Sequence, residues 1–230
     1  MEGIASVQFI LICLGMVISL TLHELAHART ALAFGDPTAK MMGRVTFNPL
    51  AHLDLVGSIV FVMSALAGVG FGWAKPVPVN KANLHPPRLG DIMVSAAGPL
   101  ANLGLAVVSG LLIRLMIHFP QIRLDAQTSR YILEFLFLMV VCNISLFIFN
   151  LIPLYPLDGH HIQREILPAH LQVPFMQWQM SFGRYLLLAI IFLPGVLRKV
   201  LNLPIPDQLG WLFTVTIFPI ADFLTGISGG

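Results

Sequence analysis

Residues 4–27 of the chain read IASVQFILICLGMVISLTLHELAH. The first part, Ile4–Leu22, carries no charge, and it approaches the roughly 20 apolar residues that a helix needs to cross a bilayer. The last five residues, 23–27, read HELAH and place two histidines four residues apart. On a helix these histidines lie on one face, one turn from each other. The stretch therefore predicts a membrane-spanning helix that ends in a polar cluster.

The composition of the whole chain agrees with this prediction. Of the 230 residues, 57% are hydrophobic and only 10% are charged, and the mean hydropathy is +0.83. Soluble domains carry about 25% charged residues, so an ordinary soluble enzyme is disfavoured, and a disordered chain is excluded because it needs low hydrophobicity. The net charge of +2 does not suggest a nucleic-acid partner. We expect an integral membrane protein in contact with the lipid bilayer.

Five further apolar runs follow the first one. Three of them are long and uncharged, whereas the two nearest the C-terminus are weaker because they contain prolines and, in the last, an aspartate. The runs cover residues 55–71, 92–113, 135–154, 185–197 and 211–227. The connections between them are short and rich in proline and glycine. We therefore predict an all-α bundle of about five or six transmembrane helices, with residues 1–230 forming a single transmembrane domain.

Two of the connections have patterns of their own. Residues 36–54 are compatible with a short re-entrant strand or hairpin around Met41–Phe47, and equally with a plain surface loop. Residues 73–91 contain four prolines and cannot form a regular helix. Their first part, Trp73–Pro78, suits either a gate over a site or an interfacial anchor.

The pattern His23-Glu24-x-x-His27 points to metal chemistry. Two imidazoles on one face of a helix are able to share a Zn²⁺ ion, and the intervening glutamate is able to act as general base toward water. A chain with this composition contains roughly 0.005 such patterns by chance. The alternative is an interfacial polar cluster that merely ends the helix.

A catalytic zinc ion takes three protein ligands and leaves one position open, so a third ligand is required. Asp158 stands out among the candidates, because it ends the run NLIPLYPLD, residues 150–158, directly after an apolar span. The prolines of this run break the helix, and irregular backbone at membrane depth is tolerated where it lines a polar cavity. Asp158 facing His23 and His27 would complete a His₂Asp site.

These motifs resemble those of the site-2 protease family of intramembrane zinc metalloproteases. The family shares H-E-x-x-H in one transmembrane helix and N-x-x-P-x-x-P-L-D-G in a later one, and residues 23–27 and 150–159 match both. Residues 95–102, SAAGPLAN, are similar to the A-G-P-x-x-N segment of the family, and residues 48–54, NPLAHLD, to its N-P-x-x-H-x-D segment. The order and spacing of the motifs also agree.

The resemblance implies a cofactor and a set of roles. It implies one catalytic Zn²⁺ ion held by His23, His27 and Asp158, with Glu24 as the general base. Asn102 corresponds to an asparagine that assists the substrate or the oxyanion in the family. The implied activity is that of a zinc metalloendopeptidase in regulated intramembrane proteolysis.

The implied partner is a transmembrane protein or peptide, cleaved within or near its transmembrane segment. A helical substrate hides its peptide bonds behind hydrogen bonds and must locally unwind before it is cleaved. A strand edge at Met41–Phe47 would be able to pair with the unwound segment. The polar residues around 36–54 and 156–161 are expected to admit water to the site.

The chain departs from the family pattern after Asp158. The family has Gly-Gly there, whereas Gly159 is followed by His160 and His161. An extra imidazole suits a competing ligand or a proton carrier, and it also suits a solvated loop. The absence of a PDZ-like domain resembles the compact prokaryotic subgroup, so the expected location is a prokaryotic (inner) cell membrane, with several passes.

Other readings stay open. A non-catalytic metal- or helix-binding protein of the same fold is one alternative, although the intact Glu24 speaks against it. An ion transporter whose intramembrane histidines and aspartate form a pathway is another. A homo-oligomer is compatible with the sequence as well.

Overall fold

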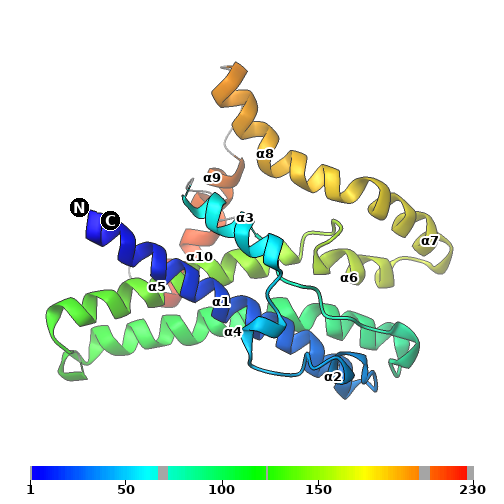
Figure 1. Ribbon diagram of the computed structural model, residues 1–230, viewed down its shortest axis with the longest axis horizontal. Coiled ribbons are helices and arrows are strands. Elements are labelled where there is room, and N and C mark those ends of the chain that lie inside the picture. Colours follow the sequence, from blue (N-terminus) through cyan, green and yellow to red (C-terminus); the bar gives the residue numbers. More distant parts are fainter. Residues whose placement is uncertain (1, 67–71, 123, 202–207, 227–230) are drawn as a thin grey trace.

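The structure is a computed structural model that describes residues 2–66, 72–122, 124–201 and 208–226. These residues form helices and no strand (Figure 1). The α-helices are α1 (Glu2–Ala33), α2 (Thr38–Met41), α3 (Leu55–Leu66), α4 (Pro87–His118), α5 (Ala126–Asn150), α6 (Asp158–Ile166), α7 (Ala169–Trp178), α8 (Arg184–Leu201), α9 (Gln208–Leu212) and α10 (Phe218–Thr225). Three short 3-10 turns are η1 (Pro49–Ala51), η2 (Lys81–Asn83) and η3 (Pro120–Ile122), and two π turns are η4 (Gln179–Gly183) and η5 (Phe213–Ile217).

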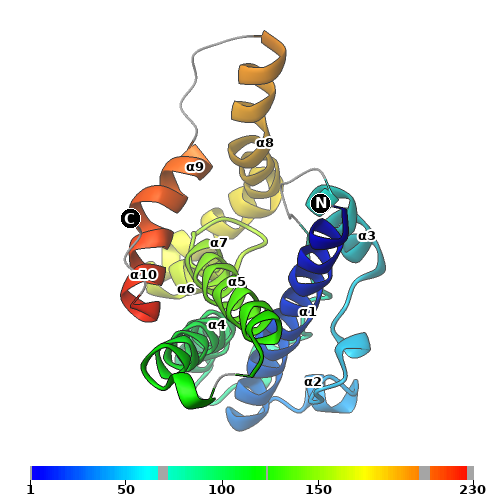
Figure 2. The same cartoon turned by 90° about the vertical axis from the view of Figure 1, so that its left-hand side faces the viewer.

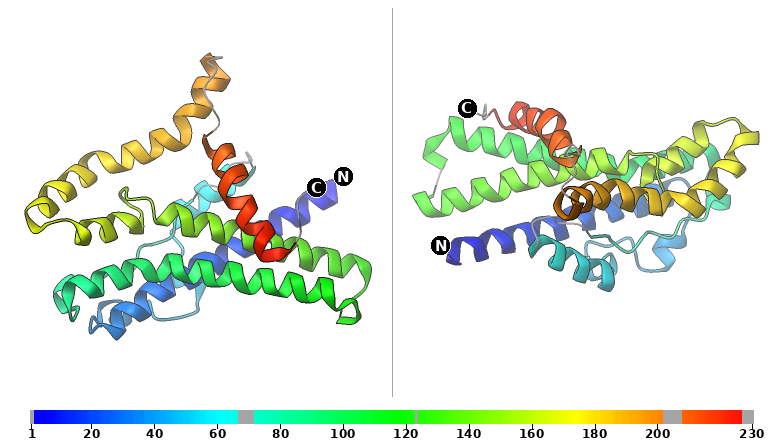
Figure 3. Two further views of the ribbon diagram at one scale, coloured as in Figure 1. Left: turned by 180° about the vertical axis from the view of Figure 1, so that it is seen from behind. Right: turned by 90° about the horizontal axis from the view of Figure 1, so that it is seen from above.

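Three long helices form the centre of the bundle. α1, α4 and α5 each contact the other two, and α6 packs on α4 (Figures 1 and 2). From behind, α10 is seen to lie across α5 and α4, which it contacts (Figure 3). The main apolar core lies where α4, α5, η5 and α10 meet. Its buried members are Ala106, Ile113, Leu136, Val140, Ile144, Ile217 and Ala221. This packing fixes α4 and α5 as the frame against which α1 is held.

Four of the described helices are long and apolar enough to cross a membrane. They are Val7–Ala33, Pro87–His118, Ala126–Asn150 and Ala169–Arg198, and two shorter apolar helices are Leu55–Leu66 and Gly210–Thr225. The predicted all-α membrane fold is confirmed, but the number of full-length spans is slightly lower than the predicted five or six.

The difference from the predicted spans has two sources. The run 55–71 forms only the 12-residue helix α3 within the described residues, and 67–71 lie outside them. The weaker run 185–197 instead belongs to a long helix, because α7 continues through the π turn η4 into α8. Hydropathy detected the apolar part of that helix and missed the more polar turns before it.

The predicted strand or hairpin within residues 36–54 does not form in the described chain. Gly43 adopts a positive φ of 70°, and the Arg44 N–H donates to the carbonyl of Ala39, which closes a turn after α2. The side chain of Asn48 accepts a hydrogen bond from Leu50 N and starts η1. These local bonds use the polar groups that a strand ladder would need. An isolated antiparallel bridge between Leu53 and Ala74 remains.

Asp36 joins the polar end of α1 to the segment that precedes α4. Its buried carboxylate accepts hydrogen bonds from the backbone N–H of Asn80 (2.7 Å) and Thr38 (3.1 Å) and from the side chain of Asn83 (3.0 Å). Burial alone would raise the pKa of Asp36, but these hydrogen bonds outweigh it and hold the pKa below the ordinary value of 3.8. The extended segment 72–79 is thereby held alongside α1.

Candidate metal centre

Three side chains from α1 and α6 converge inside the bundle. His23 and His27 lie one turn apart on α1, both buried, and their Nε2 atoms are 3.0 Å from each other. Asp158 opens α6, and its Oδ2 atom lies 3.2 Å from Nε2 of His23 and 3.3 Å from Nε2 of His27. Among the residues that the structure describes, this is the one group of three His, Cys, Asp or Glu arranged to hold a metal ion.

The hydrogen-bond partners of the two histidines determine which nitrogen of each ring carries the hydrogen. Nδ1 of His27 lies 2.6 Å from the carbonyl oxygen of Val94, and Nδ1 of His23 lies 2.6 Å from Oδ1 of Asn102. Both partners are acceptors, so each Nδ1 carries the hydrogen and each Nε2 presents a lone pair. Two lone pairs and a carboxylate oxygen that lacks a hydrogen-bond partner therefore face one another.

A zinc ion fits this donor set. Two neutral imidazoles and a carboxylate are a ligand combination that zinc uses in catalytic sites. With bonds of about 2.0–2.1 Å, the ligand atoms of a tetrahedral zinc site lie roughly 3.3 Å apart. The observed separations of 3.0–3.3 Å agree with that spacing. A cation between the three atoms would also remove the repulsion between their lone pairs.

Gly98 makes room for the imidazoles against α4. A Cβ atom at this position would lie 2.3 Å from Nε2 of His27 and 2.6 Å from Nε2 of His23. Such distances are too short for any side chain, so only glycine permits this contact. Residue 98 belongs to the SAAGPLAN segment, and the closeness of α4 to the histidines is a structural reason for its glycine.

The irregular backbone before Asp158 is held by a buried glutamine. α5 ends at Asn150, and the turns that follow contain Pro153 and Pro156. Gln179 of η4 is buried, and its Nε2 donates to the carbonyl of Pro153 (2.7 Å) while its Oε1 accepts from the backbone N–H of Tyr155 (2.8 Å). Backbone groups that lack helical partners are thereby satisfied inside the protein, as a membrane environment requires.

Glu24 is buried and has a cationic neighbour. Nη2 of Arg44 lies 3.9 Å from Oε2 of Glu24. The same guanidinium donates to the carbonyls of Lys75 (2.5 Å) and Pro76 (3.1 Å). Burial lowers the pKa of Arg44, and the negative charge of Glu24 acts in the opposite direction. Arg44 thus links the loop after α2, the extended segment 72–79 and the glutamate of the motif.

Asn102 lies behind His23. It is completely buried, and besides the bond to His23 its Nδ2 donates to Oδ1 of Asn143 (2.8 Å). Both ends of the Asn102 amide are therefore engaged by protein groups. The contact with substrate that the resemblance implies for Asn102 stays a prediction.

His160 and His161 lie in the first turn of α6 rather than in a solvated loop. His160 is almost completely buried, and its Nδ1 lies 2.5 Å from the carbonyl of Leu157. Burial, followed by the charges of His160 and Arg164, lowers the pKa of His161 to about 3, so its imidazole is neutral. His161 lines the cavity described next, and neither residue belongs to the ligand group.

A cavity of about 660 Å³ opens at the site. Glu24, His23, His27 and Asp158 line it, and its walls are mostly apolar; they include Ile12, Met16, Leu20, Phe61, Val141, Leu146, Phe149, Ile191 and Phe213. One side is formed by residues of the extended segment 72–79, whereas no residue of 36–54 lines it. Of the two stretches expected to admit water, 156–161 contributes Pro156, Leu157, Asp158 and His161 to the described lining, and 36–54 contributes none. The entry of water along them stays a prediction.

Comparisons with known proteins agree on one family. A family model for peptidase family M50 matches residues 113–194. A protein of Bacillus subtilis (strain 168), named "Putative zinc metalloprotease YwhC", is 40% identical over 179 residues, which cover 78% of each chain. A protein of Mycobacterium tuberculosis (strain ATCC 35801), named "Putative zinc metalloprotease Rip2", is 31% identical over 227 residues, 96% of this chain and 76% of that protein. No solved structure matches.

Proposed function

Because the chain belongs to peptidase family M50 and is an intramembrane zinc metalloprotease, we propose that His23, His27 and Asp158 hold its zinc ion and that Glu24 is its general base. The observation that carries this assignment is the convergence of two Nε2 lone pairs and Oδ2 of Asp158 within 3.3 Å of one another. No other residues in the described part of the chain offer such a set.

The chemistry divides between the ion and the chain. When bound by these ligands, zinc supplies a Lewis acid that polarises the scissile carbonyl and lowers the pKa of water. Glu24 lines the same cavity and takes the proton of the attacking water, then returns it to the leaving amine. Arg44, whose Nη2 lies 3.9 Å from Oε2 of Glu24, places a positive charge beside this carboxylate.

The cavity suits an apolar peptide. Its apolar walls accept the side chains of a transmembrane segment, while the glutamate and the ligands stand at one place on its surface. We therefore assign as substrate a membrane protein whose segment unwinds locally at the scissile bond. Residues 1–230 would act as a single transmembrane domain, and the bacterial relatives support a prokaryotic cell membrane as its location.

The exchange of Glu24 for glutamine tests the assignment. The Glu24→Gln protein should keep one zinc ion per chain and lose cleavage of a transmembrane test substrate, because the amide cannot accept the proton. Glu134→Gln is a matched control, since Glu134 lies on α5 in an i,i+4 pair with Arg130. Asp158→Ala should lose zinc. Full cleavage by Glu24→Gln, or unchanged zinc content in Asp158→Ala, would contradict the proposal.

A further inference from the structure

Three polar side chains form a continuous series of hydrogen bonds that ends at His23. They are Ser19 on α1, Asn102 on α4 and Asn143 on α5, and each is completely buried. Nδ2 of Asn102 donates to Oδ1 of Asn143 (2.8 Å), and Nδ2 of Asn143 donates to Oγ of Ser19 (2.9 Å). This series thus joins all three central helices at the metal ligand.

The donor and acceptor of each of these hydrogen bonds follow from the backbone carbonyls that Asn143 and Ser19 contact. Nδ2 of Asn143 also donates to the backbone carbonyl of Met139 (2.8 Å), and Oγ of Ser19 donates to the carbonyl of Gly15 (2.7 Å). Backbone carbonyls only accept hydrogen bonds, so the amide nitrogen of Asn143 must point to Met139 and its oxygen to Asn102. Asn102 must then turn its own nitrogen toward Asn143 and its oxygen toward His23.

This orientation decides the state of the ligand. An oxygen of Asn102 placed 2.6 Å from Nδ1 of His23 requires a hydrogen on Nδ1. The lone pair of Nε2 is then left to face Asp158 and His27. His27 reaches the same state by a shorter route, because the carbonyl of Val94 contacts its Nδ1 directly. The tautomer of His27 is thus fixed directly by the carbonyl of Val94. The tautomer of His23 is fixed indirectly by the carbonyl of Met139, through the side-chain amides of Asn143 and Asn102.

We propose that Asn143 and Ser19 are positioning residues of the metal centre, which act through Asn102 to hold His23 with its Nε2 lone pair toward the ion. The inference rests on the proposed function, in which His23 is a zinc ligand. Hydrogen bonds to the outer nitrogen of a ligand histidine fix its tautomer and orientation, and their loss costs about 10- to 100-fold in metal affinity. Within the described structure, the side chains of Asn143 and Ser19 make no hydrogen bond to the three proposed ligands themselves.

Zinc affinity measured by competition with a chromophoric chelator tests the proposal on the purified full chain. Asn143→Leu keeps the approximate volume of the side chain but removes the 2.8 Å acceptor of Asn102, whose Nδ2 then keeps only the longer bond to the carbonyl of Ser19 (3.5 Å). We expect a dissociation constant for zinc about 10- to 100-fold higher than in the parent protein. Ser19→Ala should have a smaller effect, because the Asn143 nitrogen keeps its bond to Met139.

Thr21→Val is the matched control. Thr21 is buried on α1, as Ser19 is, but among the described residues its hydroxyl donates only to the carbonyl of Val17 on the same helix (2.6 Å). This variant should bind zinc as the parent does. The double variant Asn143→Leu, Asn102→Leu should bind zinc no more weakly than Asn102→Leu alone, since both substitutions interrupt the same series of hydrogen bonds to His23.

A purely structural role for Asn143 gives a different result. Polar bonds between transmembrane helices contribute to stability by themselves, so thermal unfolding is measured with the zinc removed. A lower midpoint for Asn143→Leu with zinc affinity within twofold of the parent would overturn the inference. Failure of the proposed function is separate, because His23→Ala would then also keep its zinc.

Discussion

A Cβ atom added to Gly98 would lie 2.3 Å from Nε2 of His27. α4 therefore approaches the ligands more closely than any side chain allows, and the metal centre is built against bare backbone. The same helix contributes Val94, whose carbonyl contacts His27, and Asn102, whose amide contacts His23. α4 is thus the wall that sets the position of both imidazoles.

Gly98→Ala should abolish zinc binding although it favours the helix. Alanine stabilises a helix interior by roughly 0.5–1 kcal/mol relative to glycine, but its methyl group would occupy the space of the imidazoles. Zinc content by elemental analysis and helicity by circular dichroism check this expectation. Gly104→Ala is the control, because a Cβ at Gly104 meets nothing within 4 Å on the same helix. A Gly98→Ala protein with normal zinc content would disprove the role of this contact.

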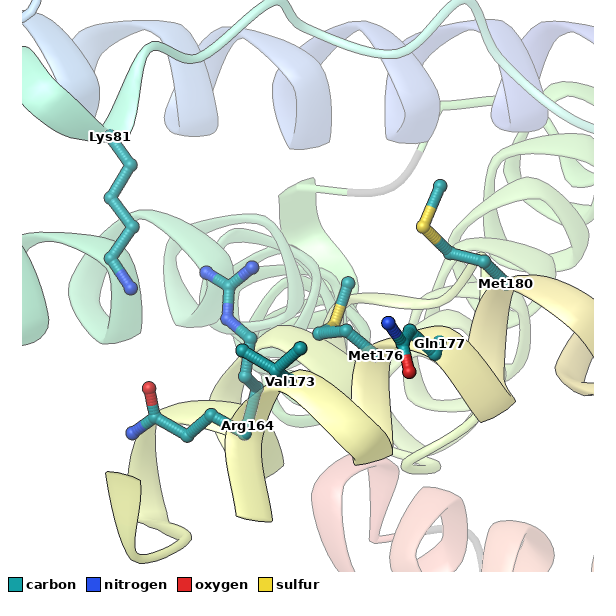
Figure 4. Close-up of a pocket in the computed structure, with 7 residues that line it drawn as sticks. Lys81, Arg164, Val173, Met176, Gln177 and Met180 are labelled. Atoms are coloured by element: carbon teal, nitrogen blue, oxygen red, sulfur yellow. The ribbon is translucent and has the colours of Figure 1, made fainter. Parts of the chain in front are cut away.

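The helix that carries Asp158 is tied to α4 by a buried ionic cluster. Arg164 of α6 pairs with Asp91 of α4 and donates from Nε to Oε1 of Glu165 (2.8 Å), and Lys81 pairs with Glu165. Figure 4 shows a second pocket, separate from the cavity at the metal centre and lined by Lys81, Arg164 and residues of α7 and η4, in which the Arg164 side chain points toward Lys81. Burial alone would raise the pKa of Glu165, but the hydrogen bonds from Lys81 and Arg164 lower it.

Arg164→Gln should destabilise the protein by about 3 kcal/mol, because it leaves two buried carboxylates with a single cation. Zinc should dissociate more easily, since α6 loses its attachment to α4. SDS-induced unfolding and zinc release to a chelator check both effects. Arg130→Gln breaks the mostly exposed pair with Glu134 and should cost no more than about 0.5 kcal/mol. Equal effects of the two substitutions would refute the distinction.

Arg44→Gln should reduce cleavage and leave zinc bound. The buried guanidinium donates to two carbonyls of the segment that lines the cavity and lies beside Glu24. Misplacement of a catalytic group costs up to about 100-fold in rate, so a fall in kcat/KM of roughly tenfold is expected when Glu24 and the lining segment lose this cation. The control is Lys40→Gln, an exposed cation on α2. Loss of zinc from Arg44→Gln would show that Arg44 supports the ligands instead.

Asp36→Asn should destabilise the metal-free protein at pH 7 and much less in acid. The folded state holds the pKa of Asp36 below 3.8, so its carboxylate stabilises the fold above that pH. As the pH falls through 3.8 and then through the lower folded pKa, the parent protein loses this contribution and the two proteins converge. Unfolding midpoints at a series of pH values check the sign. A gap that widens in acid would contradict it.

The sequence identifies the candidate ligands more readily than it identifies the residues around them. His23, Glu24 and His27 are recognisable because their spacing on a helix is short-range and because charge is rare in this chain. Asp158 is singled out by the proline-broken run that it ends, and the resemblance between motifs strengthens the choice. Nothing local in the sequence shows that it meets α1. The structure brings Asp158 to within 3.3 Å of both histidines.

The features of the site that the sequence does not predict depend on tertiary contacts. Asn143 is visible in the sequence as a polar residue in an apolar run, but hydropathy does not say which helix it faces. The segment 72–79 is recognisably extended from its prolines, yet only the packing of Asp36 and Arg44 places it beside the cavity. Of the two alternatives for Met41–Phe47, a strand or hairpin and a loop, the structure has no strand, because Gly43 and Asn48 form local turns.

The wide separation of the ligands along the chain has a consequence for synthesis. His23 and His27 enter the membrane with the first helix, whereas Asp158 lies in the last third of the 230 residues. A growing chain therefore lacks the complete set of proposed ligands while the first three of its four long apolar helices are being made. On this assignment the newborn enzyme cannot cleave the proteins assembling beside it until α6, which Asp158 opens, has left the ribosome.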